Sequence, residues 1–452
     1  MFFSREKELK ELKKIYEKPG QSALLFGKRR VGKTELILQS INDRPHIYFE
    51  CIKDTLEENL SLFVKQCQKA GVNIPSFASF NSFIDIFDYI NSLGKHYIIA
   101  IDEYPYLKEL ENPLSIDSLF QRIIDQHLNN ISLVISGSSM NIMKDLLSDG
   151  NPLFGRFNIA IKLPELNYQE AAQFYPSLSP YDRVAMYAIF GGSPFINKEI
   201  NPHLSLKENV VNTFLKEGSE VYNYANNVLI SDVANELQAR RLLSALSNSK
   251  KKFNELRDIL DKDKTGIFNR ALNSLQEVEI VHKVAPINKL NDAKKSMYEI
   301  IDNPLRFFYT YIYKNKSQLA LLGPDAFYDE YILPTIVNFI SLRFEALIRD
   351  YFSINVKKGI LKGIKNIGTY YYDDVKNKTN GEFDIAIETK DKFIIYEAKY
   401  LKKPMNKQQI YEEIKQIEQI DELAISKIGF ISINGFEEVL PKYDLISGED
   451  LY

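Results

Sequence analysis

The feature that most constrains the fold is an eight-residue run near the start of the chain. It reads Gly27-Lys28-Arg29-Arg30-Val31-Gly32-Lys33-Thr34 and matches the spacing G-x-x-x-x-G-K-[ST] of a phosphate-binding loop. Its glycines let backbone N–H groups close around phosphates, and the following helix directs its positive end toward them. The motif predicts that Lys33 reaches the β- and γ-phosphates of a nucleotide and that Thr34 ligates Mg²⁺.

The residues around this loop favour the order of elements that the motif requires. An apolar run at 22–26 predicts a buried strand, and 35–40 has helical character. Further strands are expected at 46–50, 96–103, 131–136 and 159–163, with helical periodicity at 55–70 and 80–94. Strands that alternate with helices predict an α/β domain, in which a parallel sheet carries helices on both faces.

Polar residues at the ends of these strands are the candidates for nucleotide chemistry. Asp102 and Glu103 close the strand 96–103; in such a site Asp102 would hold Mg²⁺ through water, and Glu103 would deprotonate the attacking water. Ser136 is the candidate sensor of the γ-phosphate. Arg156 could stabilise phosphoryl charge, often from a neighbouring subunit, although a solvated arginine is the alternative. The two acids could likewise merely end a strand.

Length and composition indicate a soluble protein of two to four domains. The chain has 452 residues, of which 45% are hydrophobic and 26% charged, and no apolar run approaches the ~20 residues of a membrane span. The first residues lack the apolar core of a signal peptide. Cys51 and Cys67 form no metal-binding or disulfide pattern. We therefore expect a cytoplasmic protein without a membrane partner.

One segment is basic although the whole chain has a net charge of −3. Residues 240–300 contain 13 lysines and arginines against eight aspartates and glutamates. Helices expected at 237–246, 253–260 and 265–275, followed by strands at 280–284 and 297–301, form the order of a winged helix. Its third helix would present Lys262, Lys264, Asn269 and Arg270 to a DNA major groove. Protein contacts are the alternative role of such a domain.

Several of these residues carry a resemblance to a known family. The chain resembles the archaeal-type ATPases, which are related to the origin-recognition and signal-transducing branches of the AAA+ class. The matching residues are Phe3, Arg5 and Glu6, the phosphate loop, Ile101-Asp-Glu103, Ile135-Ser-Gly-Ser-Ser139, Leu153-Phe-Gly-Arg156 and Gly191-Gly-Ser-Pro194. The resemblance extends to about residue 310 and implies that ATP is the nucleotide. It also implies that the Gly-Gly-x-Pro element, which ends at Pro194, belongs to a small helical lid and lies close to the nucleotide.

A second candidate site lies in the last third of the chain. The run 382–388 and the apolar run 393–396 are joined by four residues and predict a hairpin. If residue 388 pairs with 393, Asp384 faces Glu397 with Cβ atoms about 5 Å apart. Lys399 then lies on the same face as Glu397. Two facing carboxylates can hold Mg²⁺ for phosphodiester cleavage, and Lys399 can position the nucleophile or offset charge. A surface ion-pair cluster is the alternative.

This arrangement is similar to the PD-(D/E)XK nucleases. In their junction-resolving branch an earlier helix adds an acid, and Glu345 matches that place. The alternative for Glu345 is a solvated acid on an apolar helix. Phe383 departs from the aliphatic residue that many such nucleases carry, and the helix at 407–420 lacks the Gln-x-x-x-Tyr of exonuclease relatives. An endonuclease is therefore favoured over a processive exonuclease.

The sequence thus predicts four parts: an ATPase core at 1–165, a helical lid at 166–235, a winged helix at 236–301 and a nuclease-like domain at 302–452. The expected function is ATP-gated DNA binding with Mg²⁺-dependent cleavage. The chain could carry it out as a homo-oligomer. The alternative is a non-cleaving ATP-driven signalling or regulatory switch that uses the nuclease-like domain for binding alone.

Overall fold

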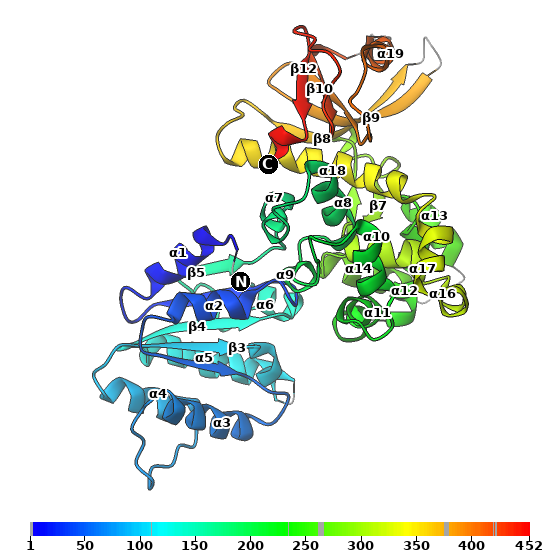
Figure 1. Cartoon of the computed structure of the whole chain (residues 1–452). Coiled ribbons are helices and arrows are strands. Elements are labelled where there is room, and N and C mark those ends of the chain that lie inside the picture. Colours follow the sequence, from blue (N-terminus) through cyan, green and yellow to red (C-terminus); the bar gives the residue numbers. More distant parts are fainter. Residues whose placement is uncertain are drawn as a thin grey trace. The chain divides into compact units, whose positions relative to one another are not determined.

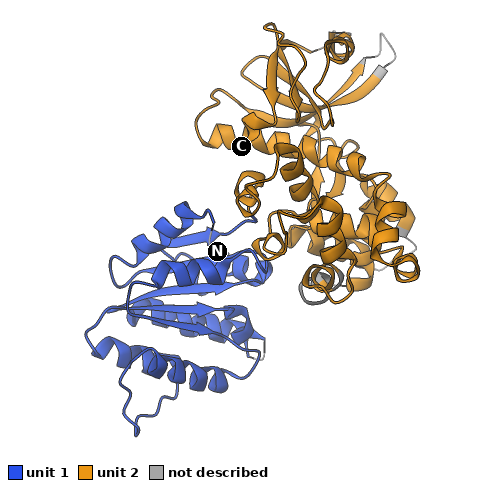
Figure 2. Cartoon of the chain, in the orientation of Figure 1, with its two compact units in different colours: residues 1–165 blue, residues 166–452 orange. Residues whose placement is uncertain are grey.

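The computed structural model describes residues 3–109, 111–233, 235–260, 266–374, 379–418, 420 and 423–452. The chain divides into two compact units, residues 1–165 and 166–452, drawn in blue and orange in Figure 2. Lys262 and Lys264, proposed above to contact DNA, lie outside the described residues. Cys51 and Cys67 are free thiols, and both are buried.

Unit 1 is built on a five-stranded sheet in which all strands are parallel. Its order is β2-β3-β4-β1-β5, with β1 Ser22–Phe26, β2 His46–Glu50, β3 Tyr97–Asp102, β4 Ile131–Gly137 and β5 Ile159–Lys162. Every residue of the three central strands is buried. Continuous apolar runs produce such strands because both faces of the sheet are covered. The prediction of a parallel α/β sheet is confirmed.

Helices cover the two faces of this sheet unequally (Figure 1). Leu24 packs with residues of α3 (Leu56–Lys69), α4 (Phe83–Ser92) and α5 (Pro113–Gln126). Its neighbours Ala23 and Leu25 pack instead with α1 (Glu6–Ile15) and α2 (Lys33–Ile41). The alternation arises because successive side chains of a strand point to opposite faces. The unit also contains η1 (Tyr104–Lys108) and α6 (Met140–Asp145).

Unit 2 begins with short helices and continues into an antiparallel strand pair. The helices are α7 Tyr168–Ala171, η2 Ala172–Phe174, α8 Pro180–Phe190, α9 Pro194–Asn197, α10 Leu206–Val210, η3 Val211–Leu215 and α11 Glu220–Asp232. Next come α12 Glu236–Leu246, α13 Phe253–Leu260, α14 Ile267–Glu277, β6 Val281–Val284, η4 Ile287–Lys289 and β7 Met297–Ile300. Strands β6 and β7 pair antiparallel. Helices α12, α13 and α14 and this strand pair occupy the region for which a winged helix is predicted, and that assignment stays a prediction.

The remainder of unit 2 combines helices with a second five-stranded sheet. The helices before it are α15 Asn303–Phe307, η5 Phe308–Ile312, α16 Lys316–Leu322, α17 Pro324–Phe327, η6 Tyr328–Ile332 and α18 Ile336–Lys357. The sheet comprises β8 Asn366–Asp374, β9 Thr379–Glu388, β10 Phe393–Lys399, β11 Ile425–Ser432 and β12 Asp444–Ser447, with α19 Lys407–Glu418 and η7 Glu449–Leu451. Its order is β12-β11-β10-β9-β8. The first three strands in sequence are antiparallel and the last two run parallel to β10.

A single apolar core runs through the helical part of unit 2 and reaches one face of its sheet. Phe214, Leu243, Phe307, Ile340 and Ile431 belong to the same cluster of buried side chains. The end of the chain joins this core, because the Leu451 carbonyl accepts hydrogen bonds from Tyr168 at 2.9 Å and Gln169 at 2.7 Å. The regions expected to be lid, winged helix and nuclease-like domain therefore share one core in this unit.

Within the described ranges no single helix combines the length and apolar character needed to cross a membrane. One pair of helices, Pro324–Ile332 and Ile336–Lys357, meets these criteria when the two are taken together, but the pair is bent by 68°.

Candidate functional site

The phosphate loop of unit 1 follows β1 directly and needs its glycines. A Cβ atom on Gly27 would lie 2.3 Å from the carbonyl oxygen of Leu163 in the adjacent chain segment. Gly32 has a φ of 93° and caps the start of α2, a conformation that glycine adopts without a steric penalty. Arg30 is also left-handed, with a φ of 67°. The loop therefore curls so that α2 begins immediately after it, at Lys33.

Lys33 lies inside this loop and is only 5% exposed. Its Nζ donates hydrogen bonds to the carbonyl oxygens of Gly27 at 3.1 Å and Lys28 at 2.9 Å. The ammonium group thus spans the loop from within, where it can meet a phosphate chain held by the backbone N–H groups. The loop's remaining variable positions are Arg29, Arg30 and Val31, of which Val31 is buried.

The two groups expected to hold Mg²⁺ are in direct contact. The Thr34 Oγ1 donates to Asp102 Oδ2 at 2.7 Å, and the Tyr48 hydroxyl donates to the same oxygen at 2.8 Å. Burial, and then the Asp102 charge, raises the pKa of Tyr48 above its usual range, so that its hydroxyl stays protonated as a donor. Mg²⁺ prefers oxygen ligands of this kind, so these residues fit the ion.

Glu103 has an unusual backbone that aims its side chain at the end of β4. Its φ is 50°, and its N–H donates to Asp102 Oδ1 at 3.0 Å. The Glu103 Oε2 accepts hydrogen bonds from the backbone N–H of Ser138 at 3.2 Å and from its hydroxyl at 2.8 Å. The Ser138 hydroxyl also lies 3.4 Å from Arg29 Nε. One carboxylate oxygen of Glu103 is therefore held in place by Ser138, and the role of Glu103 as the general base stays a prediction.

Ser138 is a residue that the sequence reasoning placed at the strand end without assigning a contact. Ser136, the expected γ-phosphate sensor, lies within β4 opposite Leu25. It is fully buried, and its hydroxyl has no hydrogen-bond partner among the described residues. Ser138 is the first residue after β4, which ends at Gly137. The role of Ser136 stays a prediction, and Ser138 is the serine that contacts Glu103.

Arg156 lies beside the amino-terminal ends of the sheet's strands, whereas the phosphate loop lies at their carboxyl ends. Its carbonyl accepts a hydrogen bond from the Ser22 hydroxyl at the start of β1, whereas the loop follows the end of that strand. Five strand residues separate the two ends by about 17 Å. The guanidinium pairs with Asp125 at 3.0 Å. Arg156 therefore cannot reach the phosphate loop of its own unit.

Pro194, which the resemblance places close to the nucleotide, is the first residue of α9 in unit 2. Its role stays a prediction.

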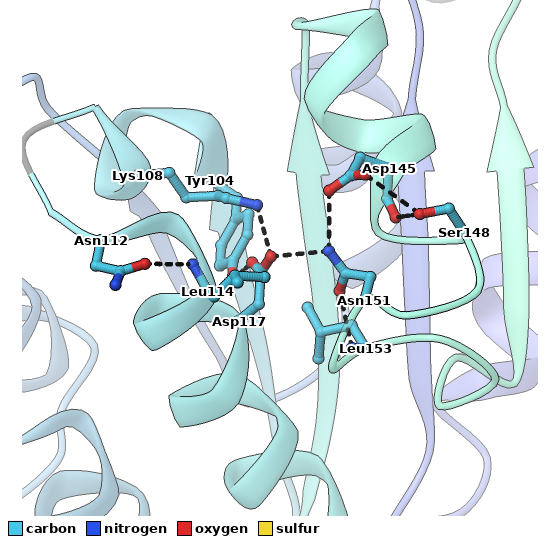
Figure 3. A network of polar contacts seen from close by, with 9 residues as sticks. All are labelled: Tyr104, Lys108, Asn112, Leu114, Asp117, Asp145, Ser148, Asn151 and Leu153. Carbon is cyan, nitrogen blue, oxygen red and sulfur yellow. Dashed lines mark hydrogen bonds and ion pairs between the residues drawn. The ribbon is translucent and has the colours of Figure 1, made fainter.

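A buried polar network links the segment after Glu103 to the segment before Arg156 (Figure 3). The Lys108 ammonium lies 2.6 Å from Asp117 Oδ2, and the Tyr104 hydroxyl donates to Asp117 Oδ1 at 2.8 Å. Asn151 Nδ2 donates to Asp117 Oδ2 at 2.9 Å and to Asp145 Oδ2 at 3.0 Å, and its Oδ1 accepts from the Leu153 N–H at 2.9 Å. Asp117 on α5 thus joins η1 to the loop that follows α6.

We predict that Lys108→Met destabilises unit 1 by about 3–5 kcal/mol, because it leaves the buried Asp117 charge without its cation. Lys53→Met is the matched control: Lys53 pairs with Glu109 at 2.9 Å, but both side chains are exposed, and such pairs contribute about 0–1 kcal/mol. Native-state hydrogen exchange of β3 and β4 peptides measures both changes in unit 1 alone. Equal effects of the two variants would contradict the prediction.

The hairpin expected in the last third of the chain has the predicted register. Phe393 pairs with Glu388, and the pairing continues to Tyr396 opposite Ile385. The pairing of β9 with β10 ends there, one residue before Asp384 and Glu397, so the expected pairing of these two acids stays a prediction. The Lys399 Nζ lies 2.8 Å from Glu397 Oε1 and 2.7 Å from Oε1 of Glu413 on α19. Glu413 was not identified from the sequence, because the surrounding residues 407–418 are typical of an ordinary charged helix.

Glu345 on α18 faces the same region. Burial, and then the neighbouring Asp384 charge, raises the pKa of Glu345 to about 7, with Glu397 adding a smaller contribution. Burial also raises the pKa values of Asp384 and Glu397. Arg349, one helical turn after Glu345, donates from NH1 to the Asp384 carbonyl at 2.8 Å. The three acids are therefore close enough to repel one another, and perturbed carboxylates of this kind often mark functional sites.

These acids do not converge on one point. Among the described residues, no three acids, histidines or cysteines form a group that could hold a metal ion.

Of the residues expected to contact DNA, Asn269 and Arg270 are exposed on α14.

Comparisons with known proteins match both units. Residues 2–196 match an ATPase domain predominantly from Archaea, and residues 308–416 match archaeal and bacterial proteins of unknown function. An uncharacterized protein of Methanocaldococcus jannaschii is 30% identical over 328 residues, which cover 71% of this chain and 70% of that protein.

Two solved structures resemble the chain weakly. A Walker-type ATPase of Pyrococcus abyssi is 19% identical with a TM-score of 0.49, covering 68% of this chain and 96% of that one. The ORC2 protein of Aeropyrum pernix, in ADPNP–ADP complexes, is 11% identical with a TM-score of 0.49, covering 71% and 95%.

Proposed function

We propose a function from one premise: this chain belongs to the family of archaeal-type ATPase-domain proteins that includes the Methanocaldococcus jannaschii relative. Unit 1 is an ATPase domain that binds ATP. On this premise, ATP turnover in unit 1 controls the engagement of DNA and its metal-dependent cleavage by unit 2. The observation that carries the ATPase half is the direct contact of Thr34 with Asp102 beside a Glu103 held by Ser138.

Each residue of the phosphate loop has one task in hydrolysis. The backbone N–H groups of residues 27–34 bind the phosphates, and Lys33 offsets charge on the β- and γ-phosphates. Thr34 and Asp102 would hold Mg²⁺, which when bound would supply positive charge beside the transferring phosphoryl group. Glu103 accepts the proton of the attacking water while Ser138 keeps its carboxylate in orientation.

Arg156 can contribute to this reaction only from a neighbouring copy of the chain, because it lies at the far edge of its own sheet. Its pairing with Asp125, with side chains 30% and 40% exposed, keeps the guanidinium near the surface, where a neighbouring copy can meet it. An arginine supplied in trans would make hydrolysis depend on assembly. We therefore include homo-oligomerisation in the proposal.

The cleavage half of the proposal is supported by Glu345, Asp384 and Glu397, which three different elements bring within electrostatic reach of one another. Such carboxylates can hold one or two Mg²⁺ ions that activate water and stabilise the leaving oxygen. Lys399 supplies the cation beside Glu397. Because no three of these side chains converge among the described residues, holding a shared ion would require side-chain rotation.

A second candidate is a switch that binds nucleic acid or protein without cutting. Two observations favour it: no three acids converge within the described part of the chain, and Lys399 is held between Glu397 and Glu413. The test is to incubate the purified protein with a panel of DNA ends, forks and junctions, with and without ATP and Mg²⁺ or Mn²⁺. Cleavage of any member supports the nuclease, and cleavage of none replaces it with the switch.

DNA binding through α14 has its own test. Lys264→Ala combined with Arg270→Ala should weaken DNA binding and reduce the slope of log affinity against log salt by about one to two units, because each phosphate contact releases about one counterion. Titrations at several salt concentrations measure this slope. If the slope is unchanged, the predicted winged helix at 236–301 contacts protein and not DNA.

A further inference from the structure

A pocket of about 290 Å³ in unit 2 is lined by more basic than acidic side chains. It lies between the segment after α12, strand β7, helix α15, helix α18 and strand β9. Its basic lining residues are Lys250, Arg306, Arg343 and Arg349, and its acidic ones are Glu299, Glu345 and Asp384. Arg306 and Arg343 are 9% and 8% exposed, so the structure buries two guanidinium groups at this place.

Most of these charges have a counter-charge nearby. Arg349 and Lys250 are the cations that act on both Asp384 and Glu345. Arg343 lies 4.0 Å from Glu299 and donates to the Ile300 carbonyl at 2.9 Å. Even so, the buried Nε of Arg343 has no hydrogen-bond partner within the described residues.

Arg306 is different because no described carboxylate lies within ion-pair distance of its guanidinium, although the charges of Glu299 and Glu345 act on it from farther away. Its guanidinium stacks over the Phe339 ring, with 5.2 Å to the ring centre, and it has no hydrogen bond or ion pair with another residue that the structure describes. Burial, together with the adjacent Arg343 charge, lowers the pKa of Arg306 to about 9. A guanidinium carries five N–H donors, and leaving them unpaired in the interior is costly.

An oxyanion would satisfy both arginines at once. The guanidinium fork matches phosphate oxygens with two parallel hydrogen bonds, and the free Nε–H of Arg343 supplies another donor. We propose that this pocket binds a phosphate group of a nucleic-acid strand, with Arg306 and Arg343 as its ligands. The nucleic-acid part rests on the proposed function, because Glu345 and Asp384 line the same pocket. A phosphate seated here would place a strand beside the acids that are proposed to cut it.

The test measures binding without any cleavage chemistry. Inorganic phosphate and a short single-stranded oligonucleotide are titrated in EDTA into the full chain carrying Lys33→Ala, so that neither the phosphate loop nor a divalent metal contributes. Arg306→Met should weaken both ligands about tenfold or more, the scale of one charge-assisted hydrogen bond. Arg306→Lys should recover only part of the loss, because an ammonium lacks the planar fork. Arg122→Met, an exposed arginine on α5 of unit 1, is the matched control and should change neither.

The outcomes separate the two proposals. Unchanged binding of both ligands in Arg306→Met overturns the pocket, even if the parent protein cleaves DNA. Weakened binding together with no cleavage of any substrate keeps the pocket and removes the nuclease. If phosphate responds and the oligonucleotide does not, the ligand is a free phosphate compound and the strand assignment is wrong. Thermal unfolding of each variant identifies loss of folding, in which case Arg306→Lys decides.

Discussion

Glu103→Gln protein is expected to bind ATP as tightly as the parent protein and to hydrolyse it at least about 100-fold more slowly. The amide has the size of the carboxylate, and its oxygen can still accept the hydrogen bonds of Ser138. It cannot accept a proton from the attacking water, and loss of a general base costs about 100- to 10,000-fold. Fluorescent-nucleotide titration measures the affinity, and phosphate release measures turnover.

Two further variants make this result specific. Lys33→Ala should abolish nucleotide binding altogether, because the ammonium that spans the loop is lost. Glu109→Gln, at an exposed surface pair with Lys53, should leave both binding and turnover unchanged. Hydrolysis by Glu103→Gln at the parent rate would show that another group is the base, and the assignment of Glu103 would be wrong.

The second large effect is expected at the carboxylates of unit 2. Asp384→Asn should reduce cleavage by at least about 100-fold, since even the outer partners of metal ligands contribute 10- to 100-fold. The substitution keeps the side chain's size but removes the charge that Mg²⁺ requires of a ligand. ATP hydrolysis should continue, because the phosphate loop belongs to unit 1. Cleavage and ATPase assays on the same preparation measure both.

Lys399→Ala and Asp391→Asn test this interpretation from two sides. Lys399→Ala should lose cleavage yet keep much of the metal affinity, because an ammonium is not a metal ligand. Asp391→Asn, an exposed acid in the turn between β9 and β10, should have no effect on either. Nicking that persists undiminished in Asp384→Asn would point to a contaminant or to another site.

Local sequence pattern determined the strands of unit 1 and the β9–β10 hairpin of unit 2 closely, whereas β8, β11 and β12 were not predicted. The apolar run 22–26 became β1 and 46–50 became β2 with the expected bounds. Residue 388 pairs with 393 as predicted, because a four-residue connection and the two-residue alternation leave little freedom of register. Thr34 and Asp102 likewise lie together because the motif follows β1, Asp102 ends β3, and parallel strands of one sheet have their carboxyl ends on the same side.

Tertiary packing alone decided the remaining features. Ser138 contacts Glu103 across 35 residues of chain, and Lys108 meets Asp117 inside a network that no periodicity indicates. Arg306 and Arg343 come together because α15 and α18 pack in one core, although neither arginine stands in a motif. Short-range patterns report which face of an element is buried, but they do not report which polar groups meet when elements distant in sequence pack. The sequence by itself therefore determined the elements and the phosphate loop, and only the fold decided which charged side chains share an interior.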